Sequence, residues 1–186
     1  IPQLADAEVI LSKVKRSPNT TLAALVPNAR GAIRAVEANL DEIVVFLSAS
    51  ESHNKKNVNR NVDESLIGFR EIADIAGKNN IPIQGDIATA FGCPFEGNVP
   101  SKRLAEISKE YKEMGFKGVT LGDTTGMATP PVVTDAINAI RDAVPDFNIT
   151  LHFHNTRGVG LANVMSGLYQ GITCLLYTSP SPRDSR

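Results

Sequence analysis

Apolar residues in this chain recur at helical spacing in some segments and in short unbroken runs in others, which predicts helices that alternate with strands. Leu4, Ala7, Leu11 and Val14 lie three or four residues apart, so we expect a helix over roughly 4–16. Similar stripes predict further helices over about 29–39, 61–76, 104–114, 129–144 and 161–169. The signals for helix ends agree with these stripes, since Asn61 and Glu64 resemble a capping box and Thr129 precedes a proline.

Five short apolar runs lie between these stripes and predict strands, of which the first is expected to be buried. The runs cover 21–28, 42–50, 81–89, 118–123 and 148–154. Strands that alternate with helices in this way indicate an α/β fold with a parallel sheet.

Two parallel architectures fit this order, the doubly wound open sheet and the (β/α)8 barrel. No Gly-x-Gly-x-x-Gly segment and no phosphate-binding loop follows a predicted strand, which weakens the nucleotide-binding forms of the open sheet. Polar residues instead follow several strands, and in a barrel these strand ends form one ring that carries the chemistry. We therefore expect a partial TIM barrel, about strands 3 to 7, truncated at both ends. The polar residues are Asn28, Ser48, Ser50, Glu51, Asp86, Asp123, His152, His154 and Asn155.

Composition limits the classes of function that the chain can have. It has 186 residues, enough for one domain, and its 42% hydrophobic and 21% charged residues are typical of globular proteins. The 19 basic and 20 acidic residues balance, so nucleic acid is not an expected partner. No apolar run is long enough for a membrane span. Two cysteines favour a reducing compartment, and we expect a cytoplasmic protein.

The last residues differ in character from the rest of the chain. The segment 174–186 is rich in Ser and Pro and resembles the in-frame translation of an adapter used to prepare sequencing libraries. A natural Ser/Pro-rich tail is the alternative. The interpretation is an incomplete catalytic domain over 1–173 followed by a non-native tail over 174–186.

A histidine pair is the strongest candidate for chemistry. His152 and His154 alternate on one strand, so both side chains face the same side of the sheet, where two imidazoles suit a divalent metal. A hydrogen-bonded structural pair is the alternative. Asp123 ends the preceding strand, where a carboxylate could bind the metal, orient a water molecule or relay protons. The other interpretation of Asp123 is that it forms the turn before Thr-Thr-Gly.

Three segments together resemble a known family. Leu121-Gly-Asp-Thr-Thr-Gly126, Gly92-Cys-Pro-Phe-Glu-Gly97 and the stretch from His152 to Asn163 are similar to 3-hydroxy-3-methylglutaryl-CoA lyases, metal-dependent (β/α)8 barrels. The resemblance covers about residues 1–173. It implies a carbon–carbon lyase that takes part in leucine degradation and ketone-body formation and cleaves its acyl-CoA substrate to acetyl-CoA and acetoacetate. The His-x-His-Asn segment is also found in condensing synthases such as isopropylmalate synthase, so that class stays open.

The resemblance also implies roles for individual residues. His152 and His154 would bind Mg²⁺ or Mn²⁺, His152 would also move protons, and Asp123 would lie beside metal and substrate. A loop with three residues would contact coenzyme A, although its two lysines could equally be a solvated surface pair. Those three residues are Lys55, Lys56 and Asn57.

Two departures from the family pattern concern the acyl pocket. Gln84 and Asp86 stand in Gln-Gly-Asp where the family often has Arg-Gly-Tyr, and Asn155 begins Asn-Thr-Arg where many members have Asp-Thr-Tyr. Because these strand ends would line the pocket, a different 3-hydroxyacyl-CoA remains open as the substrate.

Further ligands and the catalytic cysteine of the family would lie before Ile1 and after Thr173, and neither Cys93 nor Cys174 matches that cysteine. We therefore expect the chain on its own to be inactive, and a non-catalytic product is the third interpretation. The family resemblance allows a homodimer for the complete protein.

Overall fold

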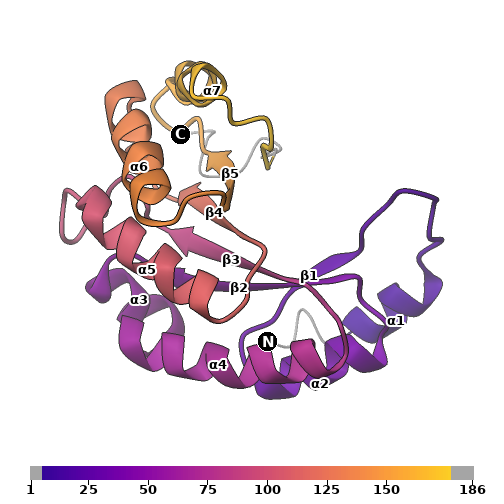
Figure 1. The fold of residues 1–186 in the computed structure, drawn as a ribbon. Coiled ribbons are helices and arrows are strands. Elements are labelled where there is room, and N and C mark those ends of the chain that lie inside the picture. Colours follow the sequence, from indigo (N-terminus) through magenta and orange to yellow (C-terminus); the bar gives the residue numbers. More distant parts are fainter. Residues whose placement is uncertain (1–5, 177–186) are drawn as a thin grey trace.

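The computed structural model describes residues 6–176 and contains one sheet of five parallel strands in the order β1-β2-β3-β4-β5 (Figure 1). Every strand therefore pairs with its neighbours in sequence, and each connection between strands contains a helix. This confirms the predicted α/β class and the parallel sheet. The strands are β1 Ala23–Leu25, β2 Glu42–Ser48, β3 Ile83–Ala88, β4 Gly118–Asp123 and β5 Asn148–Phe153.

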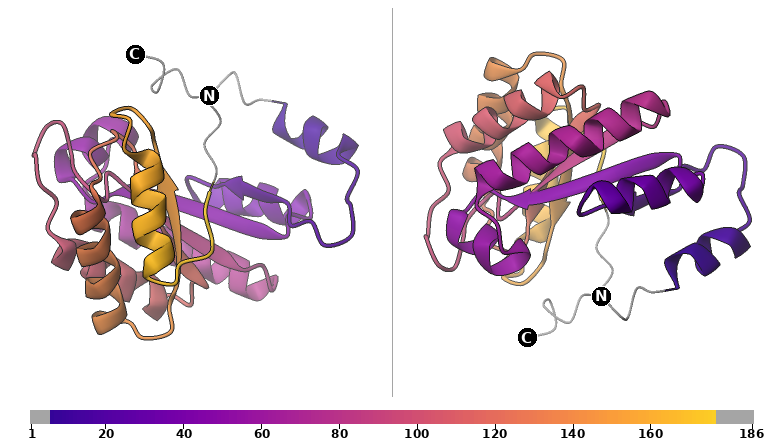
Figure 2. Two further views of the ribbon diagram at one scale, coloured as in Figure 1. Left: turned by 90° about the horizontal axis from the view of Figure 1, so that it is seen from above. Right: turned by 90° about the horizontal axis from the view of Figure 1, so that it is seen from below.

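The helices that connect the strands follow an arc along one side of the sheet (Figures 1 and 2). All six predicted helices are present, and the capping box of Asn61 and Glu64 is formed. Thr129 holds the predicted N-cap position, but its side chain makes no capping hydrogen bond. The helices are α1 Ala7–Lys13, α2 Ala29–Glu37, α3 Glu51–Val58, α4 Val62–Lys78, α5 Ser101–Glu113, α6 Pro130–Ala143 and α7 Gly160–Tyr169.

Strand alternation gives the sheet two different faces. The outer face carries Leu47, Ile87, Leu121 and Leu151, which are fully buried and belong to the hydrophobic core. The helices press closely on this face, since a Cβ atom added at Gly85 would lie 2.2 Å from the ring of an α5 tyrosine. Side chains one position along each strand point to the opposite, inner face. The inner-face residues of β2 to β5 are Val44, Phe46, Ser48, Gln84, Asp86, Ala88, Gly118, Thr120, Gly122, Asn148, Thr150 and His152.

Two expectations need correction. The first strand is shorter than predicted and is not buried, because β1 pairs only with β2 in the described sheet and leaves Leu25 63% exposed. The segment expected to be a coenzyme A loop is the helix α3. Its surface has no apolar stripe, so hydrophobic periodicity could not indicate it. The Ser50 hydroxyl accepts a hydrogen bond from the backbone N–H of His53 and starts this helix, and Asn59 in the left-handed region ends it.

The segment after α7 returns to the sheet beside β5. The N–H of Leu151 donates to the carbonyl of Cys174, and the N–H of Leu176 donates to the carbonyl of Leu151. These bonds form a single parallel bridge at that edge. The rest of the predicted tail, 177–186, and the start of the first predicted helix, at Leu4, lie outside the described residues. No helix within residues 6–176 is long and apolar enough to cross a bilayer.

Candidate active site at the carboxyl ends of the strands

The histidine pair lies where β5 ends, and its two rings face one another. Nε2 of His152 and Nε2 of His154 are 3.2 Å apart, and the ring centroids are 5.0 Å apart. Phe153 between them points the other way and packs on Phe91, with 5.5 Å between ring centroids. Both imidazoles therefore lie on one face, as strand alternation predicted.

The spacing of the two nitrogens fits one shared cation. Two nitrogen ligands about 2.1 Å from an ion and at right angles to each other are about 3 Å apart. The observed 3.2 Å is close to that value, and it is also a hydrogen-bond distance, so it fits both the metal site and the hydrogen-bonded structural pair. Within the described chain no group of three or more His, Cys, Asp or Glu side chains forms a metal cluster. The pair thus supplies two neutral ligands, and a hard divalent ion would need oxygen ligands in addition.

Asp123 at the end of β4 is 1% exposed and holds the loop that follows it. Its Oδ1 accepts hydrogen bonds from the N–H groups of Met127 at 2.8 Å and Ala128 at 3.0 Å. Its Oδ2 is buried without a hydrogen-bond partner among residues 6–176. Burial raises the pKa of Asp123, while these two hydrogen bonds and then the charges of His154 and Arg157 oppose that rise. Asp123 therefore forms the turn that its sequence context indicated and also lies within electrostatic reach of the pair.

Gln84 and Asp86 both lie on the inner face of β3, as their alternation predicted. The Gln84 amide is 3.1 Å from the Thr120 hydroxyl of the next strand. Asp86 has a buried Oδ1 with no hydrogen-bond partner in the described part of the chain. Burial raises the pKa of Asp86 to about 6. Asp86 is half-buried as a whole residue, and no ion pair among residues 6–176 offsets its charge.

The three residues predicted to contact coenzyme A lie in the last two turns of α3, at the carboxyl end of β2, and all are exposed. Lys56 places its Nζ 3.7 Å from the centre of the Phe95 ring, and Nζ of Lys55 donates to the carbonyl of Asn59 at 3.3 Å. Both lysines are exposed beside the carboxyl end of β2, so a solvated surface pair and a contact to coenzyme A both stay predictions.

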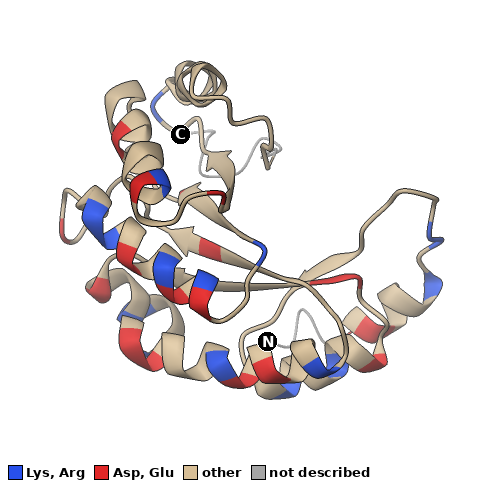
Figure 3. Ribbon diagram, viewed as in Figure 1, with Lys and Arg blue, Asp and Glu red and all other residues tan. Residues whose placement is uncertain are grey.

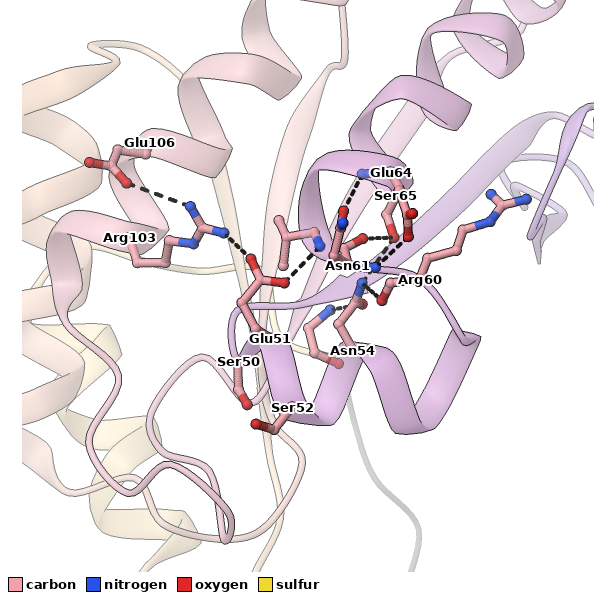
Figure 4. Close-up of polar contacts among 12 residues, drawn as sticks. Ser50, Glu51, Ser52, Asn54, Arg60, Asn61, Glu64, Ser65, Arg103 and Glu106 are labelled. Atoms are coloured by element: carbon pink, nitrogen blue, oxygen red, sulfur yellow. Dashed lines mark hydrogen bonds and ion pairs between the residues drawn. The ribbon is translucent and has the colours of Figure 1, made fainter.

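A buried network that the sequence did not indicate fixes α3 in place (Figure 4). Asn54 is fully buried, accepts a hydrogen bond from the Ser48 N–H at 2.9 Å, and donates to the Arg60 carbonyl and the Ser65 hydroxyl at 3.0 and 2.9 Å. Glu51 accepts from the first N–H of α4 at 3.0 Å and pairs with Arg103 of α5 at 2.8 Å. The network joins the end of β2 to three helices.

Two other residues make side-chain contacts that the sequence did not indicate. Asn155 is exposed, and its Oδ1 accepts the N–H of Gly160 at 3.0 Å, which holds the start of α7. His53, the third histidine of the chain, has its Nδ1 2.7 Å from the Ser48 hydroxyl. The contact could have been predicted from the spacing in the sequence. His53 follows Ser48, the last residue of β2, by five residues and lies in the first turn of the helix that Ser50 caps.

Comparison with known proteins gives a consistent result. The HMGL-like family matches residues 2–178. A hydroxymethylglutaryl-CoA lyase of Bacillus subtilis is 41% identical over 173 residues, which are 93% of this chain and 58% of that protein. The crystal structure of the HMG-CoA lyase from the same organism superposes with a TM-score of 0.90 at 40% identity, over 94% of this chain and 59% of that one.

A second solved structure is an HMG-CoA lyase from Acinetobacter baumannii in complex with coenzyme A and 3-methylmalate. It is 38% identical, with a TM-score of 0.88 over 94% of this chain and 57% of that one. The chain therefore spans little more than half the length of these relatives, and its five strands match part of their barrel.

Proposed function

The chain belongs to the HMGL-like family, and we propose that it contributes the metal-binding and substrate-facing strands of a carbon–carbon lyase for 3-hydroxyacyl-CoA thioesters such as 3-hydroxy-3-methylglutaryl-CoA. The observation that carries this proposal is the 3.2 Å separation of the His152 and His154 Nε2 atoms where β5 ends. The lyase names of the relatives favour cleavage over the reverse condensation.

The reaction breaks the bond between C2 and C3 of the acyl group. The C3 hydroxyl loses its proton and becomes a carbonyl, the electron pair of the broken bond moves to C2, and the resulting acetyl-CoA enolate takes up a proton. A divalent ion such as Mg²⁺ or Mn²⁺ would lower the pKa of the hydroxyl group.

We assign the chain's own residues to distinct tasks in this scheme. His152 and His154 would hold the ion through Nε2, and His152 would also take part in proton movement. Asp123 orients the site through the loop that it holds and through the charge it presents to His154. The Acinetobacter relative was solved with coenzyme A, and we assign the contacts to coenzyme A in this chain to Lys55, Lys56 and Asn57 on α3. Gln84, Asp86 and Asn155 belong to the acyl side of the site.

The test uses a chimera in which residues 6–173 replace the corresponding segment of the B. subtilis lyase. We expect metal-dependent cleavage of 3-hydroxy-3-methylglutaryl-CoA, with loss of Mn²⁺ binding and of nearly all turnover in His152→Ala and His154→Ala. His53→Ala is the matched control for Mn²⁺ binding, because it removes the remaining histidine and leaves the pair intact. If His154→Ala keeps full Mn²⁺ affinity, the ligand assignment is wrong.

A homodimer and a cytoplasmic location stay predictions of the sequence resemblance and composition.

A further inference from the structure

The inner face of the sheet presents one carboxyl group below the histidine pair. Asp86 lies in the same register row as Thr120 and Thr150, and His152 lies in the next row toward the carboxyl ends. The buried Oδ1 of Asp86 has no hydrogen-bond partner among residues 6–176. A buried polar atom of this kind costs free energy unless something completes its hydrogen bonds.

Small residues separate this carboxyl group from the histidines. Gly122 of β4 pairs with His152. On β3, Ala88 is the next inner-face residue after Asp86. A Cβ atom added at Gly122 would lie 3.5 Å from Oδ1 of Asp86. The Asp86 carboxylate therefore leans toward the row of the histidine pair, and no bulky side chain of β3 or β4 stands in that row. A group bound at the pair would extend over this part of the inner face.

No lysine or arginine of the five strands balances Asp86. The only charged residues on the five strands are acidic, namely Glu42, Asp86 and Asp123 (Figure 3). Lysines and arginines of the described chain lie on helices and loops instead. Lys117 immediately precedes β4, lies at the opposite end of that strand and pairs with Glu42.

We propose that Asp86 is a specificity-determining residue that selects 3-hydroxyacyl thioesters whose distal end is uncharged and donates a hydrogen bond, and that it disfavours those ending in a carboxylate. The inference rests on the proposed function and narrows its substrate class: the site still cleaves 3-hydroxy-3-methylglutaryl-CoA, which ends in a carboxylate, but with a lower kcat/KM than an analogue with an uncharged distal end.

Two physical effects act in the same direction. A hydroxyl or amide group at the end of the acyl chain donates to a carboxylate and completes the missing hydrogen bond of Oδ1. An acyl carboxylate has no proton to donate at neutral pH, and it would meet a like charge in a partly desolvated site, where such repulsion is stronger than in water.

The experiment compares two thioesters in the chimera defined above, namely 3-hydroxy-3-methylglutaryl-CoA and the same acyl-CoA with its terminal carboxylate converted to a primary amide. The second probe has nearly the same shape, lacks the charge and donates hydrogen bonds. We measure kcat/KM for both with Mn²⁺ in the original segment, in Asp86→Asn and in Asp86→Ser. Asp74→Asn, on the exposed face of α4, is the matched control for loss of one acidic charge.

Asp86→Asn should raise kcat/KM for the carboxylate substrate at least tenfold relative to the amide, and Asp86→Ser should change the ratio in the same direction. Asp74→Asn should leave the ratio unchanged. If the chimera cleaves both thioesters and neither Asp86 substitution moves the ratio, this inference is wrong and the proposed function stands. If no variant cleaves either thioester with Mg²⁺ or Mn²⁺, the proposed function fails, and the inference fails with it.

Discussion

Replacing Asp86 by Asn should stabilise the fold at neutral pH. The pKa of Asp86 is about 6 in the folded chain, against the ordinary value of 3.8, because burial disfavours the charged form. The folded state therefore binds this proton more tightly than the unfolded state does, and ionisation opposes folding. The effect is absent below about pH 4 and complete above about pH 6. A shift of roughly two units corresponds to about 3 kcal/mol, at about 1.4 kcal/mol per unit.

The assay is urea unfolding of the 186-residue chain and of Asp86→Asn, followed by circular dichroism between pH 4.5 and 8. Asn is nearly isosteric with protonated Asp, so the difference in stability should shrink to about 1 kcal/mol at pH 4.5, about a third of its value at pH 8. At pH 8 the variant should be more stable by up to about 3 kcal/mol, which for a chain of this size is a rise in Tm of roughly 6–12 °C. Asp74→Asn should differ from the original chain by less than about 0.5 kcal/mol at every pH.

The pH dependence of the difference is the deciding observation. A difference that is constant from pH 4.5 to 8 would show that Asn acts through packing or hydrogen bonding and not through the charge. If Asp86→Asn is less stable than the original chain at pH 8, the Asp86 carboxylate has a stabilising partner within the chain. The argument that a ligand completes its hydrogen bonds would then fail.

Three further perturbations test other parts of the structure. Asn54→Ala should cost about 2–4 kcal/mol in urea unfolding, because two buried contacts and one partly buried contact are lost. Asn57→Ala on the exposed side of the same helix should cost less than about 0.5 kcal/mol. Equal costs would contradict the role of the network. Gly85→Ala should destabilise the fold by at least about 1–3 kcal/mol, because its Cβ would lie 2.2 Å from the Tyr111 ring, and Tyr111→Leu in the same chain should recover part of this loss. The 186-residue chain should bind Mn²⁺ only weakly and show no acyl-CoA cleavage, because its described residues supply two imidazoles and no carboxylate cluster; tight binding in a calorimetric titration would contradict this.

Periodicity was sufficient for most of the fold because most elements bury one face. The runs at 42–50, 81–89, 118–123 and 148–154 became β2 to β5 with ends shifted by no more than two residues. The exceptions are segments whose structure depends on something other than burial. Helix α3 is held by the Ser50 cap and by Asn54, and neither produces an apolar stripe. The first strand is held by backbone pairing with β2 and buries neither face, so an apolar run did not predict its exposure.

The candidate site was predictable where strand alternation alone decides which way a side chain points. The facing rings of His152 and His154 and the inner-face position of Asp86 followed from that rule. Contacts formed through loops did not follow from it. Asp123 binds the N–H groups of Met127 and Ala128, and Asn155 binds that of Gly160. These contacts depend on the path of the loop, which has no period that a sequence could reveal.

The carboxyl groups of Asp86 and Asp123 should respond to substitution in opposite ways. Burial raises the pKa of both. Asp123 regains part of that cost through two backbone N–H groups of its own loop, so Asp123→Asn should weaken those hydrogen bonds and lower stability and turnover together. Asp86 has no such compensation within residues 6–176. Asp86 thus lowers stability, and its side chain makes no stabilising hydrogen bond or ion pair among residues 6–176. Such residues are expected at ligand-binding sites, where selection for function opposes selection for stability. At Asp86, therefore, a gain in stability should accompany a loss of selectivity.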